Sequence, residues 1–318
     1  MKKTVRDVDI TNKKVLMRVD FNVPLDARGR ITSDIRIRAT VPTIKYLLDR
    51  GAGVILCSHL GRPGGKPVDG LSLRVAARHL SKLLDQPVEM APDCIGPEVQ
   101  EMAANLKTGE ILMLENLRFH QEEKDNDNSF ARTLASLAEI YVNDAFGASH
   151  RAHASIVGVP KYLPAVSGLL LEREIKTLGS LLENPDRPFG GLFGGAKVSD
   201  KVATLENLMN RLDYLLIGGA MAALFLKAKG CEIGKSETDL DEVDTAKSLM
   251  DKMAGAGARL TLPVDVVVAE SIDPNASIET TSTENVPSNM KIVDIGPQTV
   301  HDFQEKLRDC RTIFWNGP

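Results

Sequence analysis

The sequence predicts an α/β protein of two lobes, each a parallel sheet with helices on both faces, joined by a connecting helix. Apolar runs of strand length alternate with longer segments of helical period. This alternation is typical of parallel sheets, because two parallel strands need a crossover connection that is usually a helix. The 318 residues are also enough for two domains of ordinary size.

The first lobe and the connection are predicted from the order of these segments. In residues 1–165, strands are expected at 15–19, 53–57, 111–114 and 140–142, and helices at 40–48 and at 71–80, where Ser72 is a candidate N-cap. Residues 164–183 form the one long helical pattern with no strand beside it, and the breaker cluster Asn184–Pro188 follows. We therefore predict an interdomain helix and hinge over residues 166–188.

The second lobe is predicted over residues 189–318, where short apolar runs again alternate with segments of helical period. Its strands are expected at 190–193, 214–217, 259–262 with 264–269, 292–295 and 312–315. The segment 275–289 is rich in Ser, Thr and Asn, and we expect it to be an exposed excursion.

Composition limits the class of protein. A hydrophobic fraction of 43% with 26% charged residues is typical of a soluble globular chain, and the net charge of −4 gives no case for a nucleic-acid partner. The four cysteines are far apart without a CxxC pair, which predicts neither a disulfide framework nor a zinc site. No signal peptide or membrane-spanning run is visible, so we expect a cytoplasmic protein, and a monomer because no apolar interface stripe stands out.

Polar side chains follow four predicted strands and point to an anionic ligand. Residues 1–165 hold 13 arginines against 6 in residues 166–318, and Arg grips phosphate or carboxylate in a planar fork. Ligands gather at the carboxyl ends of parallel strands. The segments at those ends are Asp20-Phe21-Asn22, Ser58-His59-Leu60-Gly61-Arg62, Glu115-Asn116-Leu117-Arg118 and Asn143-Asp144.

The strongest pattern in the second lobe is Gly194-Gly195-Ala196-Lys197, followed by Lys201. Paired glycines let backbone N–H groups approach a phosphate, and the two lysines are spaced to share one face at the start of a helix. A nucleotide polyphosphate suits this arrangement; the alternative is a helix start with two solvated lysines. No dinucleotide GxGxxG fingerprint or Walker loop is present, which argues against a dehydrogenase.

Two further patterns leave alternatives open. His150 and His153 have a spacing that metal ligands use, but no third ligand lies at a suggestive distance, so an anion-facing basic cluster with Arg151 is favoured. Asp20 and Asn22 either form a turn or recognise a hydroxyl. No nucleophile–base arrangement stands out. Phosphoryl transfer to a carboxylate needs no general base, only positioning and positive charge, and is consistent with these loops.

In order along the whole chain, these motifs resemble those of the phosphoglycerate kinase family. They are Asp20-Phe21-Asn22-Val23-Pro24, Arg36, Ser58-His59-Leu60-Gly61-Arg62-Pro63, Glu115-Asn116-Leu117-Arg118-Phe119, Asn143-Asp144-Ala145-Phe146-Gly147, His150-Arg151-Ala152-His153, Gly194-Gly195-Ala196-Lys197, Gly218-Gly219 and Trp315-Asn316-Gly317-Pro318. The resemblance implies a glycolytic enzyme that transfers a phosphoryl group reversibly between 1,3-bisphosphoglycerate with ADP and 3-phosphoglycerate with ATP, the nucleotide being bound with Mg²⁺.

The resemblance also implies a role for each site residue. Asp20 and Asn22 would hold the glycerate hydroxyl, with Phe21, Leu60 and Gly61 in the same loops. The 3-phosphate would contact His59, Arg62, Arg118 and Arg151, and Arg36 would neutralise charge at the reacting carboxyl. Lys197 would follow the transferring phosphoryl group. The nucleotide would be bound by Gly195, Ala196, Lys197, Lys201, Gly219, Asn316 and Pro318. Residues 1–165 would thus bind phosphoglycerate, and residues 189–318 nucleotide.

The sequence departs from the family at its C-terminal end. The family continues past Trp315-Asn316-Gly317-Pro318 into a segment with a ribose-binding Glu, a glycine-rich phosphate loop and the Asp that holds Mg²⁺. We therefore expect an incomplete second lobe with an uncovered sheet edge and no metal ligand in the chain.

Three functions follow as hypotheses. The first is the kinase. The second is a phosphoglycerate-binding fragment without turnover. The third is a structural or regulatory α/β protein whose arginines cap helices. Turnover separates the first from the second, and phosphoglycerate binding separates both from the third.

Overall fold

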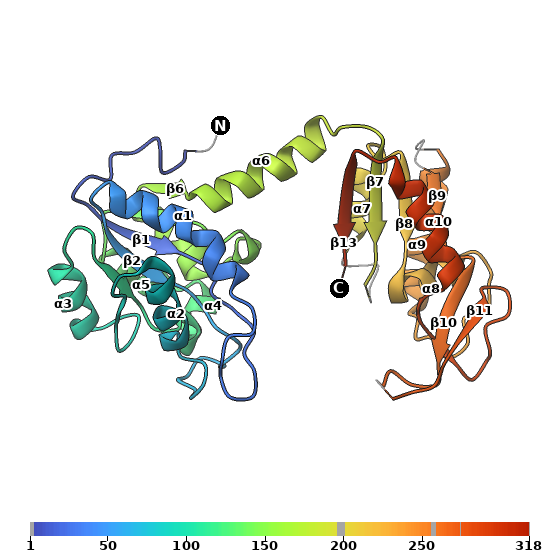
Figure 1. The fold of residues 1–318 in the computed structure, drawn as a ribbon, viewed down its shortest axis with the longest axis horizontal. Coiled ribbons are helices and arrows are strands. Elements are labelled where there is room, and N and C mark those ends of the chain that lie inside the picture. The colour runs from blue at the N-terminus through green and yellow to red at the C-terminus, as the bar shows by residue number, and fades with distance from the viewer. Residues whose placement is uncertain (1–2, 196–200, 256–258, 274, 318) are drawn as a thin grey trace. The chain divides into compact units, whose positions relative to one another are not determined.

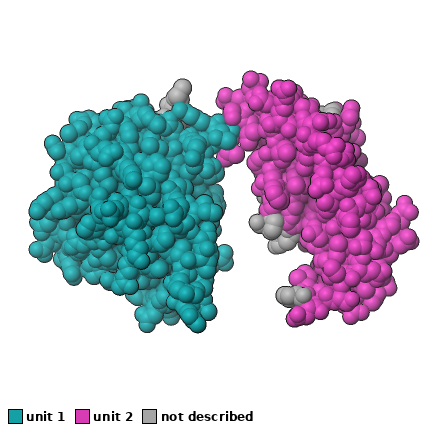
Figure 2. Space-filling view, viewed as in Figure 1, with its two compact units in different colours: residues 1–177 teal, residues 178–318 magenta. Residues whose placement is uncertain are grey.

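The computed structural model describes residues 3–195, 201–255, 259–273 and 275–317. The chain divides into two compact units, Met1–Thr177 and Leu178–Pro318, which are teal and magenta in Figure 2. No helix within the described ranges is both long enough and apolar enough to cross a membrane.

The first unit is built on a six-stranded sheet in the order β3-β4-β2-β1-β5-β6. Strands β1, β2 and β6 of this sheet are labelled in Figure 1. The strands are β1 (Lys14–Arg18), β2 (Gly53–Cys57), β3 (Glu89–Met90), β4 (Ile111–Met113), β5 (Ile140–Asn143) and β6 (Ala165–Ser167). All five pairings are parallel, so the carboxyl ends of the strands lie along one edge. The four predicted strands are present, whereas β3 and β6, of two and three residues, are too short to show a periodic pattern.

Helices cover both faces of this sheet, as predicted. They are α1 (Ile35–Asp49), α2 (Arg74–Leu84), α3 (Pro97–Asn105), α4 (Gln121–Asp125) and α5 (Asn128–Ala135), with the short helical turns η1 (Leu117–Phe119), η2 (Phe146–Ala148), η3 (Ala154–Gly158) and η4 (Val159–Lys161). Val15 and Met17 of β1 pack in the same core cluster as residues of α1 and α2. Leu16, between them, packs with α3 and α5, because successive side chains of a strand point to opposite faces.

The prediction that Ser72 is the N-cap of the second helix is wrong in position by one residue. The helix α2 begins at Arg74, and Leu73 occupies the N-cap position without a side-chain bond. The Ser72 hydroxyl nevertheless accepts the backbone N–H of Arg74 at 3.2 Å, and it donates to Glu115 Oε2 at 2.6 Å. The backbone N–H of Leu73 donates to Oε1 of the same carboxylate at 2.8 Å, so Ser72 and a buried acceptor from another loop share the capping of this helix.

The helical pattern predicted over residues 164–183 is α6 (Leu169–Glu183) only in its larger part. The prediction is wrong for residues 165–167, which form β6 and pair in parallel with β5. Asp144, which follows β5, accepts the backbone N–H groups of Leu170 and Leu171 at 2.9 and 3.0 Å. These are N–H groups that have no partner within the helix, so a carboxylate from the sheet edge fixes where α6 begins.

The second unit contains a four-stranded parallel sheet in the order β13-β7-β8-β9. Its strands are β7 (Phe189–Phe193), β8 (Tyr214–Ile217), β9 (Arg259–Thr261) and β13 (Thr312–Asn316), and the helices of the unit are α7 (Val202–Leu208), α8 (Gly219–Ala228), α9 (Leu240–Ala254) and α10 (Pro297–Arg308). Phe193 and Ile217 pack with α7, α8 and α9. Helix α10 covers the sheet at Gly190, where an added Cβ would lie 2.8 Å from Leu307.

The second unit also contains a small antiparallel sheet that the sequence analysis did not predict. Strands β10 (Asp265–Ala269), β11 (Ile278–Ser282) and β12 (Lys291–Ile295) pair in the order β11-β10-β12. The segment 275–289 is largely exposed, as expected, but it is not irregular throughout, because β11 lies within it. Apolar alternation does not reveal strand direction. The described residues of the links between these strands form no helix, and antiparallel pairs need only short links.

Candidate functional site

Three loops at the carboxyl edge of the first sheet are bonded to one another. Asn22 Oδ1, after β1, accepts the backbone N–H of Gly61, after β2, at 2.9 Å. Asn116, after β4, accepts from Leu60 N at 3.2 Å and donates to Leu60 O at 2.7 Å. Gly61 has a φ of +63° and leaves no room for a Cβ beside Leu71, so only glycine suits this close approach. These bonds fix the backbone of the predicted substrate loop.

Basic side chains, some buried and some exposed, gather beside this loop. His59 and Arg118 are buried, and Arg118 donates from one terminal nitrogen to Gly61 O at 2.8 Å. Burial lowers the pKa of Arg118, and the neighbouring charges of Arg151, Arg18 and Arg62 lower it further. The Nε of Arg118 is buried without a hydrogen-bond partner. Because several guanidinium groups act on one another here, the cluster fits an anionic ligand that would offset their charge.

His59 is held as a neutral hydrogen-bond donor. Burial, together with the charges of Arg18 and Arg118, lowers the pKa of His59 to about 2. A terminal nitrogen of Arg18 lies 3.0 Å from His59 Nδ1, and a guanidinium has only donors. Nδ1 must therefore accept, which places the single imidazole proton on Nε2.

The remaining predicted residues of the first unit lie at the same edge. Arg36 pairs with Asp20 Oδ2 at 2.8 Å. Phe21 and Leu60 have buried side chains in the core cluster, so they shape the loops through their backbones. The backbone N–H of Phe21 donates to Ser58 Oγ at 2.9 Å. Arg62 is exposed, and Arg151 is half-buried with its Nε donating to His150 Nε2 at 3.1 Å.

Sequence reasoning missed the buried network beneath the cationic cluster. Arg18 Nε donates to Ser155 Oγ at 2.9 Å, and Glu123 accepts from the Ser155 hydroxyl and backbone N–H at 2.6 and 2.9 Å. All three residues are fully buried. His153 Nδ1 lies 3.7 Å from Glu123 Oε1, so this histidine of the His-x-x-His pattern faces a carboxylate. The available signal was that Arg18 is a charged residue within the otherwise apolar run Val15–Val19.

The second unit brings two glycine loops together at the carboxyl ends of β7 and β8. Gly195 has a φ of +123° and Gly219 a φ of +60°, and a Cβ on Gly219 would lie 3.4 Å from Gly195 N. Gly194 N donates to Asn316 O at 2.9 Å. Lys201 Nζ bonds Asn316 Oδ1 and, at 2.9 Å, Gly317 O. Four of the predicted nucleotide residues thus lie close together: Gly195, Lys201, Gly219 and Asn316.

Three predicted residues, Ala196, Lys197 and Pro318, lie outside the described residues. The expected helical face shared by Lys197 and Lys201 is therefore not described in full. Lys201 occupies the N-cap position of α7, one residue before the helix, without a side-chain capping bond.

Comparisons with known proteins agree along the whole chain. A family model described as "Phosphoglycerate kinase" matches residues 5–318. The chain is similar to the phosphoglycerate kinase of Moorella thermoacetica, with 53% identity, and to that of Desulforudis audaxviator, with 52%. Both matches include the whole of this chain, which spans 80% and 81% of the lengths of the two relatives.

Two solved structures share the fold. The phosphoglycerate kinase of Coxiella burnetii matches 100% of this chain with a TM-score of 0.83 and 38% identity. That of Pyrococcus horikoshii OT3 matches 99% with a TM-score of 0.86 and 34% identity. The match covers 80% of each of those chains.

Proposed function

The chain belongs to the phosphoglycerate kinase family and is a phosphotransferase, and we propose that it transfers a phosphoryl group reversibly between 1,3-bisphosphoglycerate with ADP and 3-phosphoglycerate with ATP in glycolysis. The nucleotide is taken with Mg²⁺, which therefore enters as part of the substrate. The cluster of guanidinium groups around Arg118 is the observation that carries the proposal.

In this proposal the first unit binds the phosphoglycerate. His59 Nε2, Arg62, Arg118 and Arg151 contact the 3-phosphate. Charge-assisted hydrogen bonds to phosphate are about twice as strong as neutral ones, so this cluster supplies most of the binding. Asp20 and Asn22 bind the hydroxyl. Asn22 Oδ1 is already used by Gly61, which leaves the Asn22 amide NH₂ as the donor.

The transfer step needs charge and alignment rather than a base. A carboxylate oxygen of 3-phosphoglycerate attacks the γ-phosphorus of ATP, the new O–P bond forms, and the bond to the β–γ bridging oxygen breaks to release ADP. No proton moves, because the attacking group is already an anion. Arg36, oriented by its pair with Asp20, reduces repulsion at that carboxylate.

We assign binding of the nucleotide to the second unit. The backbone at Gly195 and Gly219, with Lys201 and Asn316, lines the polyphosphate site, and Ala196 and Pro318 complete it. Lys197 follows the transferred phosphoryl group. We assign phosphoglycerate binding to residues 1–165, the connecting helix and hinge to 166–188 and nucleotide binding to 189–318. The protein is proposed to act as a cytoplasmic monomer.

A coupled assay of ATP consumption dependent on 3-phosphoglycerate tests this function, and Lys197→Ala sharpens it. We expect the variant to lose far more in kcat than in nucleotide affinity, because its partner is the moving phosphoryl group. Equal losses in both would make Lys197 a binding residue only. Saturable phosphoglycerate binding without turnover would favour the binding-module alternative, and a folded chain with neither property would reject both.

A further inference from the structure

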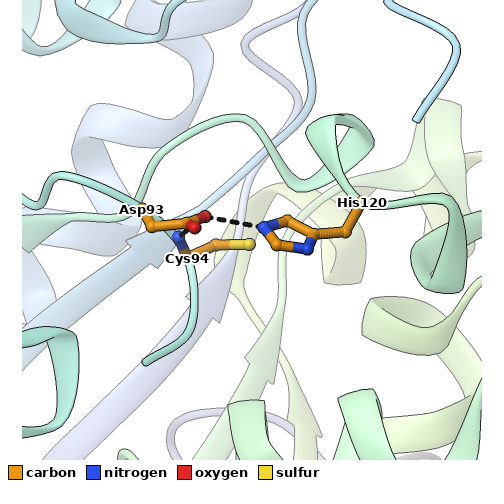
Figure 3. Close-up of side chains that lie close together, drawn as sticks. All are labelled: Asp93, Cys94 and His120. Atoms are coloured by element: carbon orange, nitrogen blue, oxygen red, sulfur yellow. Dashed lines mark hydrogen bonds and ion pairs between the residues drawn. The ribbon is translucent and has the colours of Figure 1, made fainter. Parts of the chain in front are cut away.

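Three side chains of metal-binding type meet in the first unit, and the proposed kinase reaction uses none of them. They are Asp93 and Cys94, in the loop after β3, and His120, directly after η1. One donor atom from each lies within 4.8 Å of the other two. Figure 3 shows the Asp93 carboxylate and the Cys94 sulfur both directed at the imidazole of His120. Strands β3 and β4 pair in parallel, so the two loops leave the same sheet edge.

The backbone holds these donors in place before any ligand binds. Glu115 N, after β4, donates to Asp93 O at 3.2 Å and ties the two loops together. Asp93 Oδ1 accepts the N–H of Cys94 at 2.6 Å and the His120 Nε2 proton at 2.7 Å. The His120 ring also packs against Phe130 with 5.5 Å between centroids. A site held by its supporting contacts loses little entropy when it binds.

The donor set itself favours a cation. The Asp93 carboxylate lies 2.7 Å from His120 Nε2 and contributes negative charge beside one nitrogen and one sulfur donor. Cys94 is fully buried, whereas the Asp93 side chain is 44% exposed, so the cluster reaches solvent on its carboxylate side.

We propose that Asp93, Cys94 and His120 bind one thiophilic divalent cation, with Zn²⁺ as the best match and water as the fourth ligand. Zinc takes sulfur, imidazole and carboxylate together, whereas Mg²⁺ and Ca²⁺ prefer oxygen. Tetrahedral bonds of about 2.0–2.3 Å place ligand atoms about 3.3–3.8 Å apart. The ion would thus separate Nε2 from Oδ1 and draw the remaining donors inward.

Binding of the cation would release two protons from its ligands. The Cys94 thiol gives up its proton and binds as thiolate, and His120 gives up the Nε2 proton that it now donates to Asp93. The linear pattern could not reveal this site, because His120 and Asp93 are 27 positions apart. The proposal does not depend on the kinase function.

Co²⁺ is the direct probe, because it replaces Zn²⁺ and absorbs light when bound to thiolate. We would titrate the full reduced chain with Co²⁺ in phosphate-free buffer and then add Zn²⁺. The expected result is a thiolate charge-transfer band that saturates at one equivalent and disappears with Zn²⁺. Cys94→Ser should abolish the band, His120→Gln should weaken Co²⁺ binding at least 10-fold, and the matched control Cys231→Ser should leave it unchanged.

A second readout keeps the proposal testable if a variant folds poorly. Zn²⁺ should raise the Tm of the wild-type chain and of Cys231→Ser but not that of Asp93→Asn, with circular dichroism confirming that each is folded. Absence of a thiolate band in the folded wild-type chain would overturn the proposal. A band that persists in Cys94→Ser would also overturn it, and would leave Asp93 and His120 as a structural hydrogen-bonded pair.

Discussion

Arg18 shows how one buried charge organises the anion site. It bonds His59 Nδ1 and, through Ser155, connects to Glu123, so a single guanidinium fixes a tautomer and balances a buried carboxylate. The motifs at the strand ends predicted His59 and Arg118, and the His-x-x-His pattern predicted Arg151; parallel strands bring such distant loops to one edge. Ser155 and Glu123 were beyond sequence reasoning, since their partners come from elements more than 30 positions away.

Arg62→Ala tests the phosphate contact. Loss of a charge-assisted hydrogen bond should weaken 3-phosphoglycerate binding by about 1.5–3 kcal/mol in a calorimetric titration. Arg74→Ala is the matched control, because Arg74 is also exposed and forms no ion pair among the described residues. An affinity that is equal in the two variants would remove Arg62 from the site.

The protonation state of His59 gives a second residue-scale prediction. With a pKa of about 2, its ring should stay neutral and keep constant NMR shifts between about pH 8 and pH 5. His59→Gln assigns the signal. A His59 midpoint near 6.5 would show that the site is open to water and that Arg18 does not set its tautomer.

At the scale of elements, α6 and the second-unit strands show what periodicity can and cannot predict. The period of residues 164–183 predicted a helix, but α6 begins only at Leu169, where the Asp144 carboxylate accepts its first N–H groups, and residues 165–167 form β6 instead. Strand positions 264–269 and 292–295 were predicted within two residues of β10 and β12. Their antiparallel pairing was not, because side-chain alternation is the same for both directions.

Asp144→Asn tests the contact that begins α6. Burial raises the pKa of Asp144 to about 6 from an ordinary 3.8, so the folded state favours its protonated form. This contribution to stability is complete below about pH 4 and is lost as the pH rises through 6. Relative to the variant, the wild-type chain should lose on the order of 3 kcal/mol in free energy of unfolding across that range.

Urea unfolding followed by circular dichroism at several pH values measures this difference. Asp127→Asn is a control of opposite sign, because backbone bonding to Phe130 lowers the pKa of Asp127. That carboxylate stabilises the fold above its unfolded pKa and loses the effect as the pH falls. A pH-independent difference between wild type and Asp144→Asn would contradict the assigned burial of Asp144.

At the scale of the whole molecule, the sequence predicted the α/β class and the family, and the comparisons confirm both. The boundary between compact units falls between Thr177 and Leu178, inside α6. The extra antiparallel sheet belongs to the second unit alone. Every residue assigned to phosphoglycerate lies in the first unit, so binding of that ligand can be tested separately from turnover.

A calorimetric titration of the full chain with 3-phosphoglycerate, in buffer free of phosphate and sulfate, tests the central claim most directly. The cationic cluster predicts saturable binding at one site. Absence of binding by a chain that circular dichroism shows to be folded would contradict the assignment of His59, Arg62, Arg118 and Arg151 to the 3-phosphate.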